Sequence, residues 1–101
     1  MKLKHYEIAI RELTHAIQLD ATLHLAYLER GYSKHFLGNY IGAIQDYNKA
    51  IKIKPDYDEA YFDRAAAGMK VNQVQQGCDD LLKAGNLGNK NAMNIYEQYC
   101  K

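Results

Sequence analysis

The sequence predicts an all-α fold made of repeated helical hairpins, and three observations indicate it. Apolar residues recur at helical spacing in segments separated by short turn signals. The chain also resembles itself at a period of 34 residues. Its single proline, Pro55, stands where one period closes and the chain must turn into the next hairpin.

The 34-residue register holds without a gap and keeps residues of similar size aligned. Small, aromatic and aliphatic positions all follow it, which chance does not produce. The aligned sets are Ala9, Ala43 and Gly77; Leu13, Tyr47 and Leu81; Ala16, Ala50 and Ala84; Leu19, Ile53 and Leu87; Ala26 and Ala60; Tyr27 and Tyr61; and Arg30 and Arg64.

Each period contains two predicted helices. The first segment, residues 4–19, aligns with the second helix of a period and has no first helix before it. Residues 23–38 carry an apolar helical stripe and end at Gly38, a C-cap, after which Asn39 can cap the helix over 40–54. Pro55 disfavours helical geometry at Lys54 and so ends that helix.

Three further helices complete the prediction. Asp56 is expected to cap a helix over 56–71, and Asn72 to open one over 72–85 that stops in a glycine-rich stretch. A short last helix covers 91–101. The chain is therefore a single domain with an incomplete repeat (1–23), a full repeat (24–57), a degenerate repeat (58–91) and a capping helix (92–101).

The aligned small residues indicate where helices approach closely. Gly31 and Ala65 are expected on first helices, facing Ala43 and Ala50 on a second helix. Tyrosines are expected to fill the wider gaps between helices, because a tyrosine can bury its ring and still leave its hydroxyl exposed to solvent.

These motifs resemble the tetratricopeptide repeat (TPR), over residues of about 4–91. The residues that carry the resemblance are Ala9, Leu13, Ala16, Tyr27, Gly31, Ala43, Tyr47, Ala50, Pro55, Tyr61, Ala65, Gly77, Leu81 and Ala84. The chain departs from the family pattern at four positions. Arg30 and Arg64 stand where an aliphatic residue is usual, Gly77 stands where Ala is usual, and Asn89 stands where Pro would fall. The C-terminal segment is also similar to the ends of bacterial TPR proteins.

The resemblance implies a right-handed α-α superhelix of about two and a half repeats plus a cap, whose first helices line a concave groove. In the family this groove receives an extended peptide or a helix of a partner protein. Carried over by position, the partner-binding groove comprises Leu25, Leu28, Glu29, Tyr32, His35, Glu59, Phe62, Asp63, Ala66 and Met69. Tyr32 and Phe62 can alternatively be ordinary packing residues between helices.

The groove residues argue against one ligand mode of the family. TPR domains that bind chaperone C-termini use a carboxylate clamp of Lys, Arg and Asn. This chain has Glu29 where Asn is needed, Asp63 where a cation is expected and Glu59 in place of Lys. Such an acidic rim repels a carboxylate and favours a partner with Lys or Arg, unless Arg30 and Arg64 pair with these acids.

Composition excludes several other classes. The 101 residues are 48% hydrophobic and 25% charged, with 13 basic and 12 acidic side chains giving +1, so neither disorder nor bulk nucleic-acid binding is expected. We interpret the basic stretch of Lys49, Lys52 and Lys54 as a solvated helix face and not as a nucleic-acid-binding patch. No signal peptide or membrane span is expected, and a cytoplasmic location is predicted, although the chain can be a fragment of a longer protein.

Nothing in the sequence predicts catalysis, a metal or a cofactor. The four histidines, His5, His15, His24 and His35, are nine residues or more apart, and no pair has the i, i+4 spacing of a metal site. No phosphate loop or nucleophile motif occurs. Cys78 and Cys100 are expected to be free thiols, with a disulfide as the alternative. The protein is therefore predicted to be an interaction scaffold and no enzyme.

A structural role is the alternative function. The opening helix is expected to expose Leu3, Tyr6, Ile10 and Leu13, because no preceding helix covers them. Such a face would either mediate homodimerisation or stack on missing upstream repeats.

Overall fold

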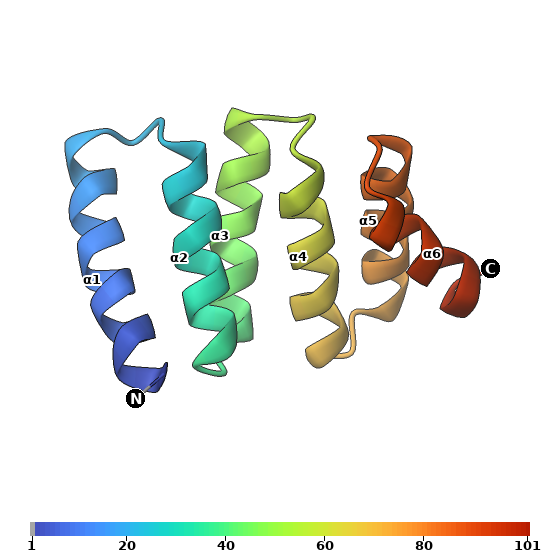
Figure 1. Cartoon of the computed structure of the whole chain (residues 1–101), viewed down its shortest axis with the longest axis horizontal. Helices are drawn as coiled ribbons and strands as arrows, with labels where there is room; N and C mark the ends of the chain where they lie inside the picture. Colours follow the sequence, from blue (N-terminus) through green and yellow to red (C-terminus); the bar gives the residue numbers. More distant parts are fainter. Residues whose placement is uncertain (1) are drawn as a thin grey trace.

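The computed structural model describes residues 2–101, which form a row of antiparallel helices in chain order (Figure 1). Within that range there are six helices and no strand. None of them is both long and apolar enough to cross a membrane. The helices are α1 (Lys2–Leu19), α2 (His24–Phe36), α3 (Tyr40–Ile53), α4 (Asp58–Lys70), α5 (Val74–Asn86) and α6 (Lys90–Tyr99). The all-α repeat fold is thus confirmed.

Two tight turns share the sequence Leu-Gly-Asn and one geometry. Gly38 and Gly88 have φ of 85° and 107°, a left-handed conformation that favours glycine. The following residues, Asn39 and Asn89, cap the next helix, because their side-chain oxygens accept hydrogen bonds from the third residue on at 2.9 and 3.0 Å. The predicted turn at Gly38 and Asn39 is confirmed.

Two predicted helix starts are wrong. Asp56 does not cap α4, whose N-cap is Tyr57 with no side-chain hydrogen bond. Asn72 does not open α5 but lies before it with φ of 63°, as the residue 34 positions after Gly38. Asparagine tolerates the left-handed conformation better than most residues, which explains its presence in this turn.

The α2–α3 hairpin buries the small residues of the repeat. Ala43 and Ala50 are fully buried and the Tyr47 side chain is only 1% exposed. A Cβ atom at Gly31 would lie 2.7 Å from the Tyr47 ring and 3.1 Å from the Ala43 carbonyl oxygen, so only glycine fits. The close approach of first and second helices follows from these residues.

The same ion pair recurs in both complete hairpins. Arg30 of α2 donates to Asp46 of α3, and Arg64 of α4 donates to Asp80 of α5, each through Nε at 2.9 Å and a terminal nitrogen at 2.7 Å. The aspartates are 4% and 3% exposed. Two buried carboxylates are therefore neutralised by arginines 16 residues earlier in the chain.

The predicted apolar stripe on α1 is largely wrong. Leu3 is 56% exposed, but Tyr6, Ile10 and Leu13 are half-buried. Tyr6 is covered because its ring stacks on Phe36 of α2, with centroids 5.5 Å apart.

The expectation of free thiols is also wrong. Cys78 of α5 and Cys100, which follows α6, form a disulfide with their Cα atoms 5.7 Å apart. The Leu87–Asn89 turn folds α6 back along α5, so both the distance and the helix phase allow the bond.

Candidate functional site

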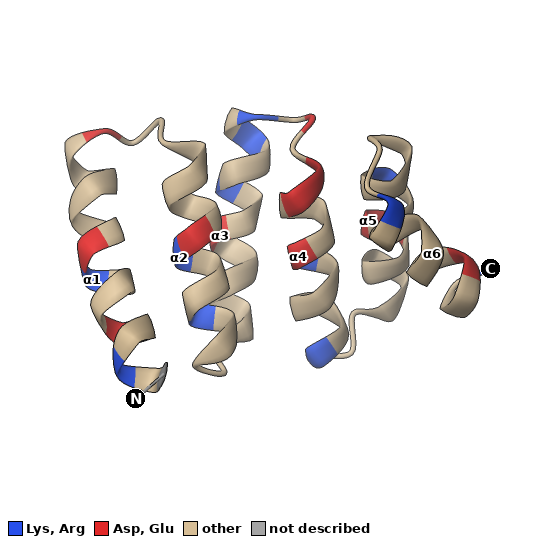
Figure 2. Cartoon of the chain, viewed as in Figure 1, with Lys and Arg blue, Asp and Glu red and all other residues tan. Residues whose placement is uncertain are grey.

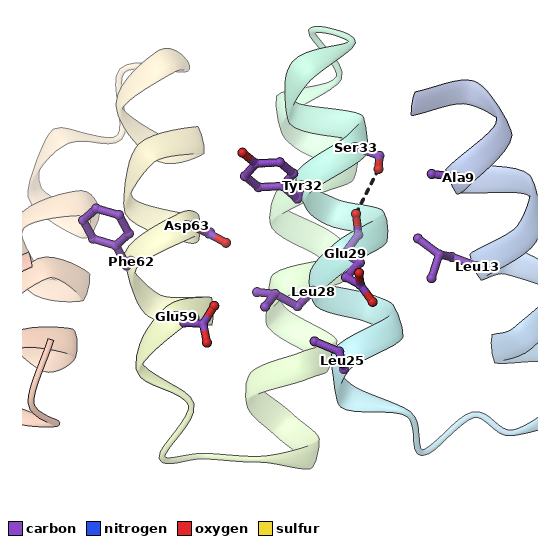
Figure 3. Close-up of a pocket in the computed structure, with 10 residues that line it drawn as sticks. All are labelled: Ala9, Leu13, Leu25, Leu28, Glu29, Tyr32, Ser33, Glu59, Phe62 and Asp63. Carbon is purple, nitrogen blue, oxygen red and sulfur yellow. Dashed lines mark hydrogen bonds between the residues drawn. The ribbon is translucent and has the colours of Figure 1, made fainter. Parts of the chain in front are cut away.

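A groove runs across α2 and α4 and consists of three cavities that share Phe62. The cavities have volumes of about 510, 200 and 160 Å³. The structure brings together all ten residues predicted for the groove, since each lines at least one of the three cavities. Figure 3 shows the largest cavity, which lies between α1, α2 and α4.

The apolar lining is open to solvent at several points. Leu25 and Tyr32 are 54% and 47% exposed, and Ala66 is exposed as well. Leu28 differs, because it is only 6% exposed and belongs to the core as much as to the groove. Exposed apolar and aromatic side chains beside a cavity are typical of surfaces that take apolar anchors from a partner.

Aromatic rings form the middle of the groove. Tyr32 lies against Phe36 with ring centroids 4.7 Å apart, and His35 contacts both Phe36 and Tyr40 at 5.0 Å. Burial, together with the nearby Lys70, lowers the pKa of His35, which keeps its imidazole neutral near pH 7. His35 is therefore a neutral aromatic lining of the groove.

Three carboxylates face the largest cavity. Glu29 comes from α2, while Glu59 and Asp63 project from α4 toward α2 (Figure 3). Burial, with a contribution from the Glu59 charge, raises the pKa of Asp63 to about 7. Among the side chains that the structure describes, no Lys or Arg lines this cavity. Figure 2 shows acidic segments on both α2 and α4.

The arginines that could have neutralised these acids point elsewhere. Arg30 and Arg64 pair with Asp46 and Asp80, so the predicted alternative of pairing with the rim acids is wrong. Lys34 also pairs with Asp46, at 3.1 Å. Among the side chains that the structure describes, none forms an ion pair with Glu29, Glu59 or Asp63. The groove therefore keeps its negative charge.

Ala9, Leu13 and Ser33 also line the largest cavity but were missed in the sequence. The family pattern assigns the groove to first helices, whereas α1 is a second helix. Because no first helix precedes it within residues 2–101, its side chains reach the groove directly. The signal that could have found them is the alignment of residues 4–19 with the second helix of a period.

The described residues of this region do not form a metal site. In residues 2–101 no three His, Cys, Asp or Glu side chains come together in a way that could hold a metal ion. The site offers apolar surface and negative charge, which are recognition chemistry.

The fold and groove define a class of protein, the helical-hairpin solenoids. A family model described as the TPR repeat matches residues 34–71. The SGT1 homologue of Oryza sativa subsp. japonica is 33% identical over 70 residues, which are 69% of this chain and 19% of the relative. The chain spans about a fifth of the length of the curated relatives that it matches.

Solved structures agree with this assignment. The second TPR domain of human RPAP3, in complex with an HSP70 peptide, is 26% identical with a TM-score of 0.86, and the match covers 95% of this chain and 82% of that one. The Arabidopsis OM64 TPR domain is 25% identical with a TM-score of 0.88, covering 94% and 79%. The chain belongs to the tetratricopeptide repeat family.

Proposed function

We propose that this chain is a protein-interaction module that binds a peptide or helix of a partner in the groove across α2 and α4. The observation that carries the proposal is the continuous lining by exposed apolar and aromatic side chains, with Phe62 shared by all three cavities. The RPAP3 domain, a similar structure, is bound to a peptide. An amphipathic helix laid into a groove uses this kind of surface.

Charge indicates which partner fits. The RPAP3 peptide, SGPTIEEVD, ends in acidic residues. Glu29, Glu59 and Asp63 would repel such a ligand, and desolvating them without a cation would cost free energy. A ligand with Lys or Arg beside its apolar anchors instead neutralises them. The proposed partner is therefore a basic amphipathic segment.

The test uses three amphipathic peptides of one length with one apolar face. Their polar positions carry Lys and Arg, Gln, or Glu, and the acidic RPAP3 ligand serves as a fourth peptide. We expect affinity, measured by fluorescence anisotropy, to fall in that order by on the order of tenfold per step. Because the carboxylates are partly solvated, added salt should weaken the basic peptide most.

Groove variants locate the binding. Tyr32→Ala with Phe62→Ala should weaken the basic peptide at least about tenfold. The matched control is Ile41→Ala with Val74→Ala, which removes apolar residues 54% and 55% exposed that line none of the three cavities. Equal affinity for the basic and acidic peptides would contradict the charge preference, and equal loss in both variants would contradict the groove.

A further inference from the structure

Within residues 2–101, no helix covers the face of α1 that corresponds to the buried faces of α3 and α5. In α3 the repeat positions Ala43, Tyr47 and Ala50 are at most 1% exposed, because α2 packs on them. In α5, Leu81 and Ala84 are 3% and 0% exposed beneath α4. The residues at the same positions of α1 are only half-buried: Ala9, Leu13 and Ala16.

The acid of the repeated ion pair is also present on α1. Asp46 and Asp80 each accept two hydrogen bonds from an arginine of the helix packed against them. The residue 34 positions before Asp46 is Glu12, which is exposed. Among the side chains that the structure describes, none forms an ion pair with Glu12. Glu12 thus occupies the position at which both complete hairpins have an aspartate that binds an arginine.

The two complete hairpins also specify what such a face binds. The helices that cover α3 and α5 present the same motif, Tyr27-x-x-Arg30-Gly31 and Tyr61-x-x-Arg64-Ala65. Each guanidinium lies over the ring of its own tyrosine, at 5.7 and 5.5 Å, and reaches the aspartate opposite. The small residue after the arginine allows the backbones to approach.

We infer that the uncovered face of α1 binds an amphipathic helix carrying Tyr-x-x-Arg followed by Gly or Ala, whose arginine pairs with Glu12. The helix would take the place that α2 has on α3, with its small residue over Ala9 and Leu13. A second copy bound through the same face about a two-fold axis would bring two Glu12 carboxylates into one interface, whereas an arginine-bearing helix supplies the opposite charge.

The proposed binding surface on α1 differs from the groove in its charged residue, Glu12. Ala9 and Leu13 line the largest cavity as well, but Glu12 and Ala16 line none of the three groove cavities. A helix on α1 would therefore form a wall at the α1 end of the groove. Its binding depends on Glu12, while the proposed groove ligand depends on Tyr32 and Phe62, so the two interactions can fail independently.

The experiment uses the whole chain and a labelled peptide with the sequence of its residues 23–37, LHLAYLERGYSKHFL. We expect the peptide to bind and to protect the amides of residues 9–16 from hydrogen exchange. Glu12→Arg should weaken binding at least about tenfold, and a peptide with Arg30→Glu should restore much of that loss. The matched control is Glu7→Arg, because Glu7 is an exposed acid about 140° around the same helix.

Four results would overturn the inference. The first is no binding at millimolar peptide, and the second is equal binding by the wild-type and Glu12→Arg chains. Protection confined to α4 would place the peptide in the groove instead. A chain that dimerises without peptide and protects residues 9–16 in doing so would assign this face to a second copy.

Discussion

Arg64 and Asp80 join α4 to α5 through two hydrogen bonds of 2.9 and 2.7 Å, with the Asp80 side chain 4% exposed. The guanidinium also donates to Asn48 of α3 at 2.8 Å, so one side chain ties three successive helices. Favourable interaction with Asp80 raises the pKa of Arg64 further and keeps it charged. This geometry repeats at Arg30, which contacts Asp46 and Thr14.

Removing the acid should destabilise the array. Asp80→Ala leaves the half-buried Arg64 guanidinium without its main partner, and we expect the free energy of unfolding to fall by about 3 kcal/mol. Asp79→Ala is the control, since this neighbouring carboxylate is exposed, and should change stability by less than about 0.5 kcal/mol. Urea denaturation measures both, and similar midpoints for the two variants would contradict the role of the pair.

Two glycines should respond in opposite ways to alanine. Gly31→Ala places a methyl group 2.7 Å from the Tyr47 ring and should cost about 1–3 kcal/mol. Gly68→Ala meets only ordinary contacts, 3.6 Å or more away, and should stabilise α4 by about 0.5–1 kcal/mol through helix propensity. Thermal melts of both variants test the close approach of α2 to α3. A change in melting temperature of the same sign in both variants would contradict it.

The repeat register predicted the fold because packing enforces it. Only small residues fit where Gly31 approaches α3, so the small positions recur every 34 residues and are visible in the sequence. The errors lie where local chemistry was judged without tertiary contacts. Asp56 has a side chain suited to capping but lies outside the cap position. Asn72 was taken for a helix start by its residue type, although the 34-residue register aligns it with Gly38, whose left-handed turn conformation it adopts.

The site was predicted less completely than the fold. The family pattern located all ten groove residues, because position in a repeat fixes which way a side chain points. It could not show which acid each arginine contacts, since Arg30 and Arg64 have adjacent acids in sequence but pair with residues 16 positions away. The disulfide likewise depended on the phase of two helices, which sequence spacing does not determine.

Reduction of the Cys78–Cys100 disulfide should loosen the C-terminal helix. Within residues 2–101 α6 packs mainly on α5, and the bond closes a segment with a sequence separation of 22. We expect reduction to lower stability by about 3 kcal/mol and to speed amide exchange in α6 more than in α2. The Cys78→Ala, Cys100→Ala double variant should melt like the reduced chain. A melt unaffected by reductant would contradict this stabilising role.

Stability should depend on pH through Asp63. Its folded pKa of about 7 lies above the ordinary value of 3.8, so the folded state binds the proton more tightly than the unfolded state. Stability from this group is therefore fully present below pH 4 and is lost as the pH rises toward 7. Asp63→Asn removes this loss and should stabilise the chain at pH 8 by about 2–4 kcal/mol relative to wild type.

Protonation of Asp63 should also affect ligand binding. Above pH 7 Asp63 is ionised and attracts a basic ligand, so wild-type affinity for the basic peptide should increase between pH 6 and 8. Asp63→Asn should flatten this rise, because the variant lacks the carboxyl group whose pKa lies near 7. Calorimetric titration at several pH values, in buffers of different ionisation enthalpy, measures both the affinity and the protons released. If wild type and Asp63→Asn released equal numbers of protons, Asp63 would not contact the bound cation.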